Sequence, residues 1–211
     1  MTKSILKRCG VKLNNKTMKK GFTLLELLIV IGILAILSIT MILVINPAEL
    51  LKKARDSQRI ADLSTVKTAI AYYITETAVP DIGSSTQSYS DVAGNTCFGT
   101  ASTATSIAVD SSGWIPIAFD GLAGGSPIGS LPRDPNQSLL AGNHYYAYGV
   151  LSATDYTFKL VTNMESTYFS SGQTGDVETN DGGTNTGLYE IGTGMTKAIA
   201  TSSACFTTTT P

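Results

Sequence analysis

The chain has 211 residues, which is enough for one globular domain of ordinary size and a long helix. Its formal net charge is −1, yet residues 1–21 hold seven basic residues and no acidic one. Residues 22–211 therefore carry eight basic and 16 acidic residues, a net charge of −8. This balance argues against a general nucleic-acid-binding protein, because phosphate recognition depends on clustered Lys and Arg side chains, and we expect no direct nucleic-acid partner.

Residues 1–21 are predicted to form a basic leader peptide that is cleaved off. The segment ends in Lys19-Lys20-Gly21 immediately before a long apolar run. An ordinary secretory signal has a shorter apolar core, and its small-residue cleavage site follows that core. Here the expected scissile bond, Gly21–Phe22, precedes the apolar run. Because basic flanks stay in the cytoplasm, we expect the leader inside and the C-terminal domain outside.

The apolar run predicts a helix over residues 22–46. From Phe22 to Ile45 there are 24 residues, of which only Glu26 is charged. A helix of this length measures about 36 Å and can cross the roughly 30 Å core of a bilayer. A carboxylate in that core costs about 2.5–3.5 kcal/mol unless it is paired, so Glu26 is expected to need a partner.

A kink or local break is expected at Pro47, because proline lacks the backbone N–H and clashes with the preceding turn. The helical pattern resumes in amphipathic form over residues 47–78 and is predicted to end near Thr77, so the two segments together make one long rod. This second half needs a surface to pack on. Its apolar positions recur at spacings of mostly three or four: Leu50, Leu51, Ala54, Ala61, Leu63, Val66, Ile70, Tyr73 and Ile74.

The remainder is predicted to be a loop over residues 79–113, then a sheet and C-terminal loop region over residues 114–211. Strand candidates rich in aromatic and β-branched residues are Trp114–Phe119, Tyr145–Val150, Tyr156–Asn163 and Leu188–Ile191. Pro116 reduces the first to an edge strand or an irregular extended segment. A helix followed by hairpin-connected strands indicates an α+β fold, with a small antiparallel sheet packed on the amphipathic half of the helix.

Three cysteines divide between the leader and the domain. Cys9 lies in the leader, so its removal leaves Cys97 and Cys205 as an even pair in a compartment where disulfides form. We predict a Cys97–Cys205 bridge. The alternative is two separate buried thiols.

An acidic, glycine-rich stretch is a candidate calcium site. Asp176, Glu178, Asn180 and Asp181 alternate oxygen ligands of the kind that calcium binds. The spacing is not that of an EF-hand, because the sixth position from Asp176 is Asp181, where a glycine is needed. The alternative is a solvated acidic turn and a protein without a cofactor.

Catalytic patterns are weak. His144 is the only histidine, which argues against a histidine metal site or a serine triad. The stretch Gly121-Leu-Ala-Gly-Gly lacks the lysine of a phosphate-binding loop. We therefore expect a protein that is not an enzyme.

The segment Lys19-Lys20-Gly21-Phe22-Thr23-Leu24-Leu25-Glu26, followed by 19 uncharged residues, resembles the class III signal of bacterial type IV pilins and type II secretion pseudopilins. The resemblance implies cleavage after Gly21 by a prepilin peptidase, N-methylation of Phe22, and pairing of Glu26 with the N-terminal amine of a neighbouring subunit. Residues 130–135, with Pro132-Arg133-Asp134-Pro135, and the tyrosines of residues 145–148 resemble the major-pseudopilin-like group. Many pilins place the helix proline nearer the apolar start than Pro47.

The resemblance implies a structural subunit that polymerises with its own copies into a helical type IV pilus for adhesion, motility or DNA uptake. The alternatives are a pseudopilin of a type II secretion system and a membrane-anchored binding domain that does not polymerise. Further expected partners are an inner-membrane assembly platform with its ATPase, and the membrane before assembly. The precursor is expected in the cytoplasmic membrane and the assembled filament outside the cell.

Overall fold

The computed structural model describes residues 21–93, 97–98, 100–136 and 144–195 of the chain. Contacts divide the chain into two compact units, Met1–Ile45 and Asn46–Pro211. The first unit contributes one helix, α1 (Leu24–Ile45). Its run of Leu and Ile residues is interrupted by no proline, and Thr23 caps its first turn by accepting a hydrogen bond from the backbone N–H of Glu26 at 3.1 Å.

The second unit opens with helix α2 (Pro47–Glu76). Asn46 adopts a left-handed conformation with φ of 43°, and its side chain accepts a hydrogen bond from the Glu49 N–H. Pro47 occupies the start of α2, where its missing N–H would have had no partner inside the helix. The rod expected from the sequence is thus two helices with Asn46 between them.

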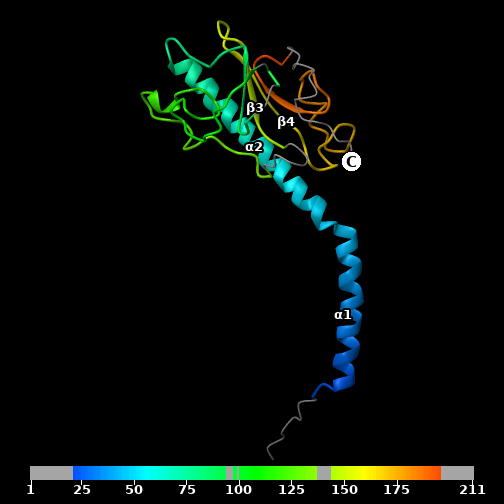
Figure 1. The fold of residues 1–211 in the computed structure, drawn as a ribbon. Coiled ribbons are helices and arrows are strands. Elements are labelled where there is room, and N and C mark those ends of the chain that lie inside the picture. The colour runs from blue at the N-terminus through cyan, green and yellow to red at the C-terminus, as the bar shows by residue number, and fades with distance from the viewer. Residues whose placement is uncertain (1–20, 94–96, 99, 137–143, 196–211) are drawn as a thin grey trace, which may run out of the picture. The chain divides into compact units, whose positions relative to one another are not determined.

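The second unit also contains a five-stranded sheet, which packs against α2 (Figure 1). The spatial order is β2-β1-β3-β4-β5, with every neighbouring pair antiparallel except β1 and β2. The predicted α+β class is confirmed. The strands are β1 (Gln87–Ser90), β2 (Thr100–Ala101), β3 (Ala147–Ser152), β4 (Thr157–Thr162) and β5 (Tyr189–Gly192).

The core lies between one face of α2 and the sheet. Leu63, Val66 and Ile70 are fully buried on the helix side. Trp114 is fully buried beside them, and its indole N–H donates to the carbonyl of Pro132 at 3.0 Å. Aromatic contacts then continue towards β3, because the ring of Tyr146, the residue before β3, lies 6.4 Å from that of Trp114. This core packs α2, the sheet and the segment around Trp114 against one another.

One sequence prediction about strands is wrong, and for another segment the structure shows the second of two expected alternatives, irregular chain in place of an edge strand. The stretch expected to be only loop, residues 79–113, contains β1 and β2, and β1 is hydrogen-bonded inside the sheet between β2 and β3. Residues Trp114–Phe119 form no named strand. They are buried extended chain with isolated bridges, followed by the 3-10 helix η1 (Phe119–Gly121). Pro116 explains this outcome, because it cannot donate to a ladder.

Candidate functional site

The expected processing segment precedes the first helical turn. Gly21, Phe22 and Thr23 lie outside any helix or strand, and the Phe22 side chain is 81% exposed. Because α1 begins only at Leu24, the Gly21–Phe22 bond belongs to extended chain and not to a hydrogen-bonded helix. An exposed, non-helical peptide bond is the geometry that a peptidase needs.

Glu26 has a local role that the sequence prediction missed. It stands three residues after the cap residue Thr23, which is the Thr-x-x-Glu spacing of a helix capping box. A carboxylate in the first turn also interacts favourably with the positive end of the helix dipole. The spacing was visible in the sequence. The pairing of Glu26 with a neighbouring subunit stays a prediction, since only one chain is present.

Nothing within the described residues covers α1. Its large apolar side chains, from Leu24 to Ile45, are between 46% and 82% exposed where described. Leu24–Ile42 is the one described helix that is long and apolar enough to cross a membrane. By the hydrophobic effect, so large an apolar surface needs lipid or other apolar helices around it.

A buried ion-pair network fixes α2 to the rest of the second unit. Arg59 has a fully buried side chain and donates from Nε and Nη2 to the two carboxylate oxygens of Asp134, at 2.7 and 2.9 Å. Its Nη1 also donates to Asp56 at 2.6 Å. Burial alone would lower the pKa of Arg59, but the hydrogen bonds and charge of Asp134, and then those of Asp56, raise it above its usual value.

Asp91, at the end of β1, joins this network to the sheet. Its two carboxylate oxygens accept the backbone N–H groups of Asp134 and Tyr146, both at 2.9 Å. Burial raises the pKa of Asp91 to about 6, although these two hydrogen bonds oppose the shift. The segment 132–135 noticed in the sequence is therefore held from both sides, by Arg59 of α2 and by Asp91.

Residues 165–168, here called the clamp loop, grip the first turns of α2. The Asp56 carboxylate accepts the backbone N–H groups of Glu165 and Ser166 at 2.9 and 2.7 Å. Glu49 accepts both the N–H and the hydroxyl of Thr167, at 2.6 and 2.7 Å. Arg55 pairs with Glu165 at 2.5 and 2.7 Å. Burial raises the pKa of Glu165. The hydrogen bond and the charge of Arg55 lower it by a larger amount, so the pKa of Glu165 lies below its usual value.

The buried face of α2 differs from the sequence prediction in its first half. Leu50, Leu51, Ala54 and Ala61 are exposed, whereas Asp56 and Arg59 are fully buried. A periodic pattern in the sequence could have identified Asp56 and Arg59 as buried. Positions 56, 59, 63, 66, 70 and 73 form one stripe at alternating spacings of three and four.

The four calcium candidates do not point to one centre. Asp176 accepts the N–H groups of Gly172 and Thr179, and Glu178 accepts those of Met164 and Ser171. Asp181 accepts the N–H groups of Gly183 and Glu190, while Asn180 donates its amide to the Asp176 carbonyl. No group of three His, Cys, Asp or Glu side chains among the described residues could hold a metal. The carboxylates brace the loop, and the calcium site stays a prediction that this geometry does not favour.

Cys97 is fully buried, with its sulfur 3.6 Å from the Tyr145 hydroxyl. Cys205, its expected partner, lies outside the described residues, so the bridge stays a prediction.

His144 is 9% exposed, and its Nδ1 lies 3.0 Å from the amide oxygen of Asn163. This ring contacts an amide and not a nucleophile, which gives no catalytic pair.

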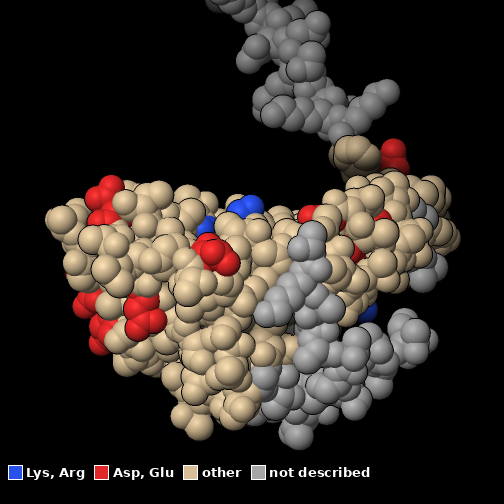
Figure 2. Space-filling model, turned by 90° about the horizontal axis from the view of Figure 1, so that it is seen from above, with Lys and Arg blue, Asp and Glu red and all other residues tan. Residues whose placement is uncertain are grey.

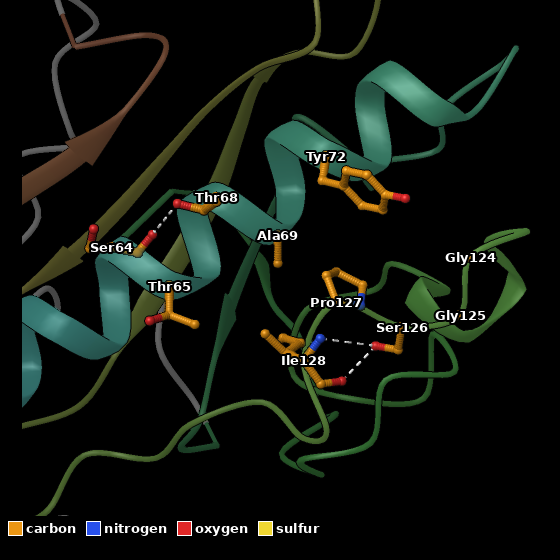
Figure 3. A pocket seen from close by; sticks show the side chains of 10 residues that line it. All are labelled: Ser64, Thr65, Thr68, Ala69, Tyr72, Gly124, Gly125, Ser126, Pro127 and Ile128. Carbon is orange, nitrogen blue, oxygen red and sulfur yellow. Dashed lines mark hydrogen bonds between the residues drawn. The ribbon is translucent and has the colours of Figure 1, made fainter.

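A groove of about 510 Å³ runs between the outer face of α2 and residues 124–128 (Figure 3). Its lining is uncharged, and the hydroxyls of Thr65 and Thr68 donate to carbonyls within α2. It therefore offers no acid, base or metal ligand.

The face of the second unit in Figure 2 is largely uncharged too, with carboxylates more frequent than basic side chains.

Residues 16–42 match the family model described as the prokaryotic N-terminal methylation motif. The matched segment contains Gly21, Phe22 and Glu26 together with most of α1. No curated protein and no solved structure matches the chain.

Proposed function

We propose that this chain, whose N-terminal methylation motif is the class III signal of type IV pilins and pseudopilins, is a structural subunit of a type IV pilus. A prepilin peptidase cleaves the precursor after Gly21, and Phe22 is then N-methylated. The mature chain is drawn from the membrane by an assembly platform with its ATPase. It polymerises with its own copies into an extracellular filament for adhesion, motility or DNA uptake.

One observation carries the proposal. The described part of α1 is apolar and exposed all along its length in a single chain, and it directly follows the processing motif. A membrane covers such a helix in the precursor, and bundled copies of the same helix cover it in a filament. The positive N-terminal amine of one subunit and the Glu26 carboxylate of the next then offset each other's cost of burial.

A pseudopilin of a type II secretion system is the second candidate. The resemblance of residues 130–135 and of the tyrosines of residues 145–148 to that group favours it. Both candidates share cleavage, methylation and polymerisation, and they differ in filament length and location. A membrane-anchored domain that never polymerises is the third candidate. It accounts for Glu26 only through the helix cap and leaves the carboxylate in the bilayer without an opposite charge.

The test combines mass spectrometry with electron microscopy of sheared cells. We expect a mature chain that begins at a methylated Phe22, and long surface fibres that contain it. Glu26→Gln keeps a residue that suits the capping box but removes the charge, so it should be cleaved normally and assemble poorly. Thr23→Val, which removes the cap and keeps the charge, is the matched control. An intact leader would contradict the proposal, and normal fibres from Glu26→Gln would contradict the pairing of Glu26 with the N-terminal amine.

A further inference from the structure

The first turns of α2 carry two exposed leucines beside two half-buried lysines, and the ion-pair network uses none of them. Leu50 and Leu51 are 58% and 60% exposed, and Lys52 and Lys53 follow them directly. Tyr168 of the clamp loop is 38% exposed, and the Lys53 Nζ lies 4.4 Å from the centre of its ring. We call these five residues the basal patch.

The clamp loop holds the basal patch together. Glu49, one residue before Leu50, accepts two hydrogen bonds from Thr167, one residue before Tyr168. The Arg55–Glu165 ion pair fixes the other end of the clamp loop to the next turn of α2. Contacts on both sides of the cation–π contact between Lys53 and Tyr168 therefore hold Tyr168 beside α2.

Chain length places the basal patch close to the membrane surface whatever the angle between the two helices. The candidate span ends at Ile42, and Lys53 is 11 residues further along the chain. At about 1.5 Å per helical residue, with up to about 3.8 Å for the non-helical step at Asn46, this is at most roughly 19 Å from the end of the span. The headgroup region and a Debye length of about 8 Å cover most of that distance.

The chemistry of the basal patch fits such a surface. Amphipathic aromatic rings such as that of tyrosine favour the headgroup level, and lysine stems lie along apolar surface while their ammonium groups reach polar surroundings. Among the neighbouring charges, Arg55 is paired with Glu165, and Glu49 is hydrogen-bonded to Thr167. Residues Pro47 to Ala54 include two lysines and one glutamate, so the net charge of this stretch is positive on a domain that is otherwise acidic.

We propose that the basal patch docks the unassembled precursor on the anionic phospholipid headgroups of the membrane that α1 spans. Leu50 and Leu51 enter the interface, Tyr168 lies at headgroup level, and Lys52 and Lys53 contact the lipid phosphates. Docking holds the second unit at the membrane until assembly removes it. The inference rests on the membrane-inserted precursor of the proposed function, and it does not depend on which filament is formed.

The test uses the full chain in nanodiscs at one copy per disc. Tyr168→Trp provides a fluorophore at the basal patch, and the chain without this change gives the background from the buried Trp114. A lipid with a headgroup spin label quenches the fluorophore when the patch is docked. We expect stronger quenching in discs of phosphatidylglycerol than in discs of phosphatidylcholine, and a decrease at high salt.

Two charge variants complete the design. Lys52→Gln and Lys53→Gln should each lower the docked-to-undocked ratio about fivefold in phosphatidylglycerol, the factor expected for one lysine near an anionic surface. Lys67→Gln, on the same helix 14 residues beyond Lys53, is the matched control and should change nothing.

Equal quenching in both lipids, or an equal loss with Lys67→Gln, would overturn the docking proposal. A second series with two copies per disc tests the other occupant: quenching that differs only between the two series would also overturn the proposal, because a second copy would then cover the patch. A chain that fails to enter the discs at all would instead contradict the membrane-inserted precursor. The two failures are therefore distinguishable.

Discussion

Arg59 of α2 and Asp134 of the segment 132–135 form a two-point ion pair, 75 residues apart in sequence and buried from solvent. Asp56 adds a second carboxylate to the same guanidinium at 2.6 Å. Asp91 then holds the backbone of Asp134 from the side of the sheet. These contacts fix α2, the 132–135 segment and the residues that flank β1 and β3 as one body.

Replacing Asp134 by asparagine should lower the free energy of unfolding by about 3–5 kcal/mol, because it leaves the Arg59 charge buried without its main partner. Trp114, the only tryptophan and fully buried, reports unfolding of the second unit in urea. Arg133→Ala is the matched control. Arg133 is exposed, donates to the Thr105 carbonyl, and should contribute about 1 kcal/mol or less. Equal effects of the two changes would contradict the role given to the buried pair.

The helix face shows what the sequence can and cannot predict. Leu63, Val66, Ile70 and Tyr73 are apolar at helical spacing, so burial of this half of α2 follows from the pattern. Towards the N-terminus of α2 the same stripe continues with Arg59 and Asp56. Their burial depends on carboxylates and backbone N–H groups supplied by residues far away in sequence. No local pattern contains those partners.

The strands show a similar division. β3, β4 and β5 are rich in aromatic and β-branched residues, and their sequences indicate them to within about two residues. β1 reads Gln-Ser-Tyr-Ser and becomes a strand because it pairs with β3 on one side and β2 on the other. The processing motif, by contrast, is local, and its residues Gly21, Phe22 and Glu26 are readable directly from the sequence.

Stability should depend on pH through Asp91, because burial raises its folded pKa to about 6, above the ordinary value of 3.8 for an aspartate. Between these two values the folded chain keeps a proton that the unfolded chain has lost. The contribution of Asp91 to stability therefore falls as the pH rises from about 4 to 6, by up to roughly 3 kcal/mol, and is constant above that. The lowered pKa of Glu165 acts in the opposite direction, with stability lost as the pH falls below its usual range.

Asp91→Asn removes this titratable group. It also removes one hydrogen-bond acceptor, because asparagine has one side-chain oxygen where aspartate has two. The loss of the acceptor is independent of pH, so the difference in unfolding free energy between the wild type and Asp91→Asn isolates the proton. We expect that difference to shift in favour of the variant between about pH 4 and 6 and then to level off. Urea unfolding at several pH values measures it. A difference that stays constant from pH 4 to 8 would show that Asp91 titrates normally.

Glu178 should be a structural carboxylate of the acidic loop. It is 5% exposed and accepts the N–H groups of Met164 and Ser171. Glu178→Ala leaves the buried Met164 donor without its partner and should destabilise by about 1–3 kcal/mol, while the exposed Ser171 can turn to water. Asn180→Ala, at an exposed position of the same loop, is the control and should cost about 0.5 kcal/mol. We expect millimolar calcium to leave the melting temperature unchanged. A rise of several degrees that Asp176→Ala abolishes would instead establish the calcium site.

The last prediction concerns Cys97, which is buried beside Tyr145. If it is bridged to Cys205, the mature chain has no free thiol, and thiol labelling of the denatured protein should give none without a reductant. The bridge closes a long loop and should contribute about 2–4 kcal/mol, so a reductant should lower the melting temperature of the wild type. The Cys97→Ser/Cys205→Ser double variant should start lower and show no further effect of the reductant. Two labelled thiols per mature chain would establish separate cysteines instead.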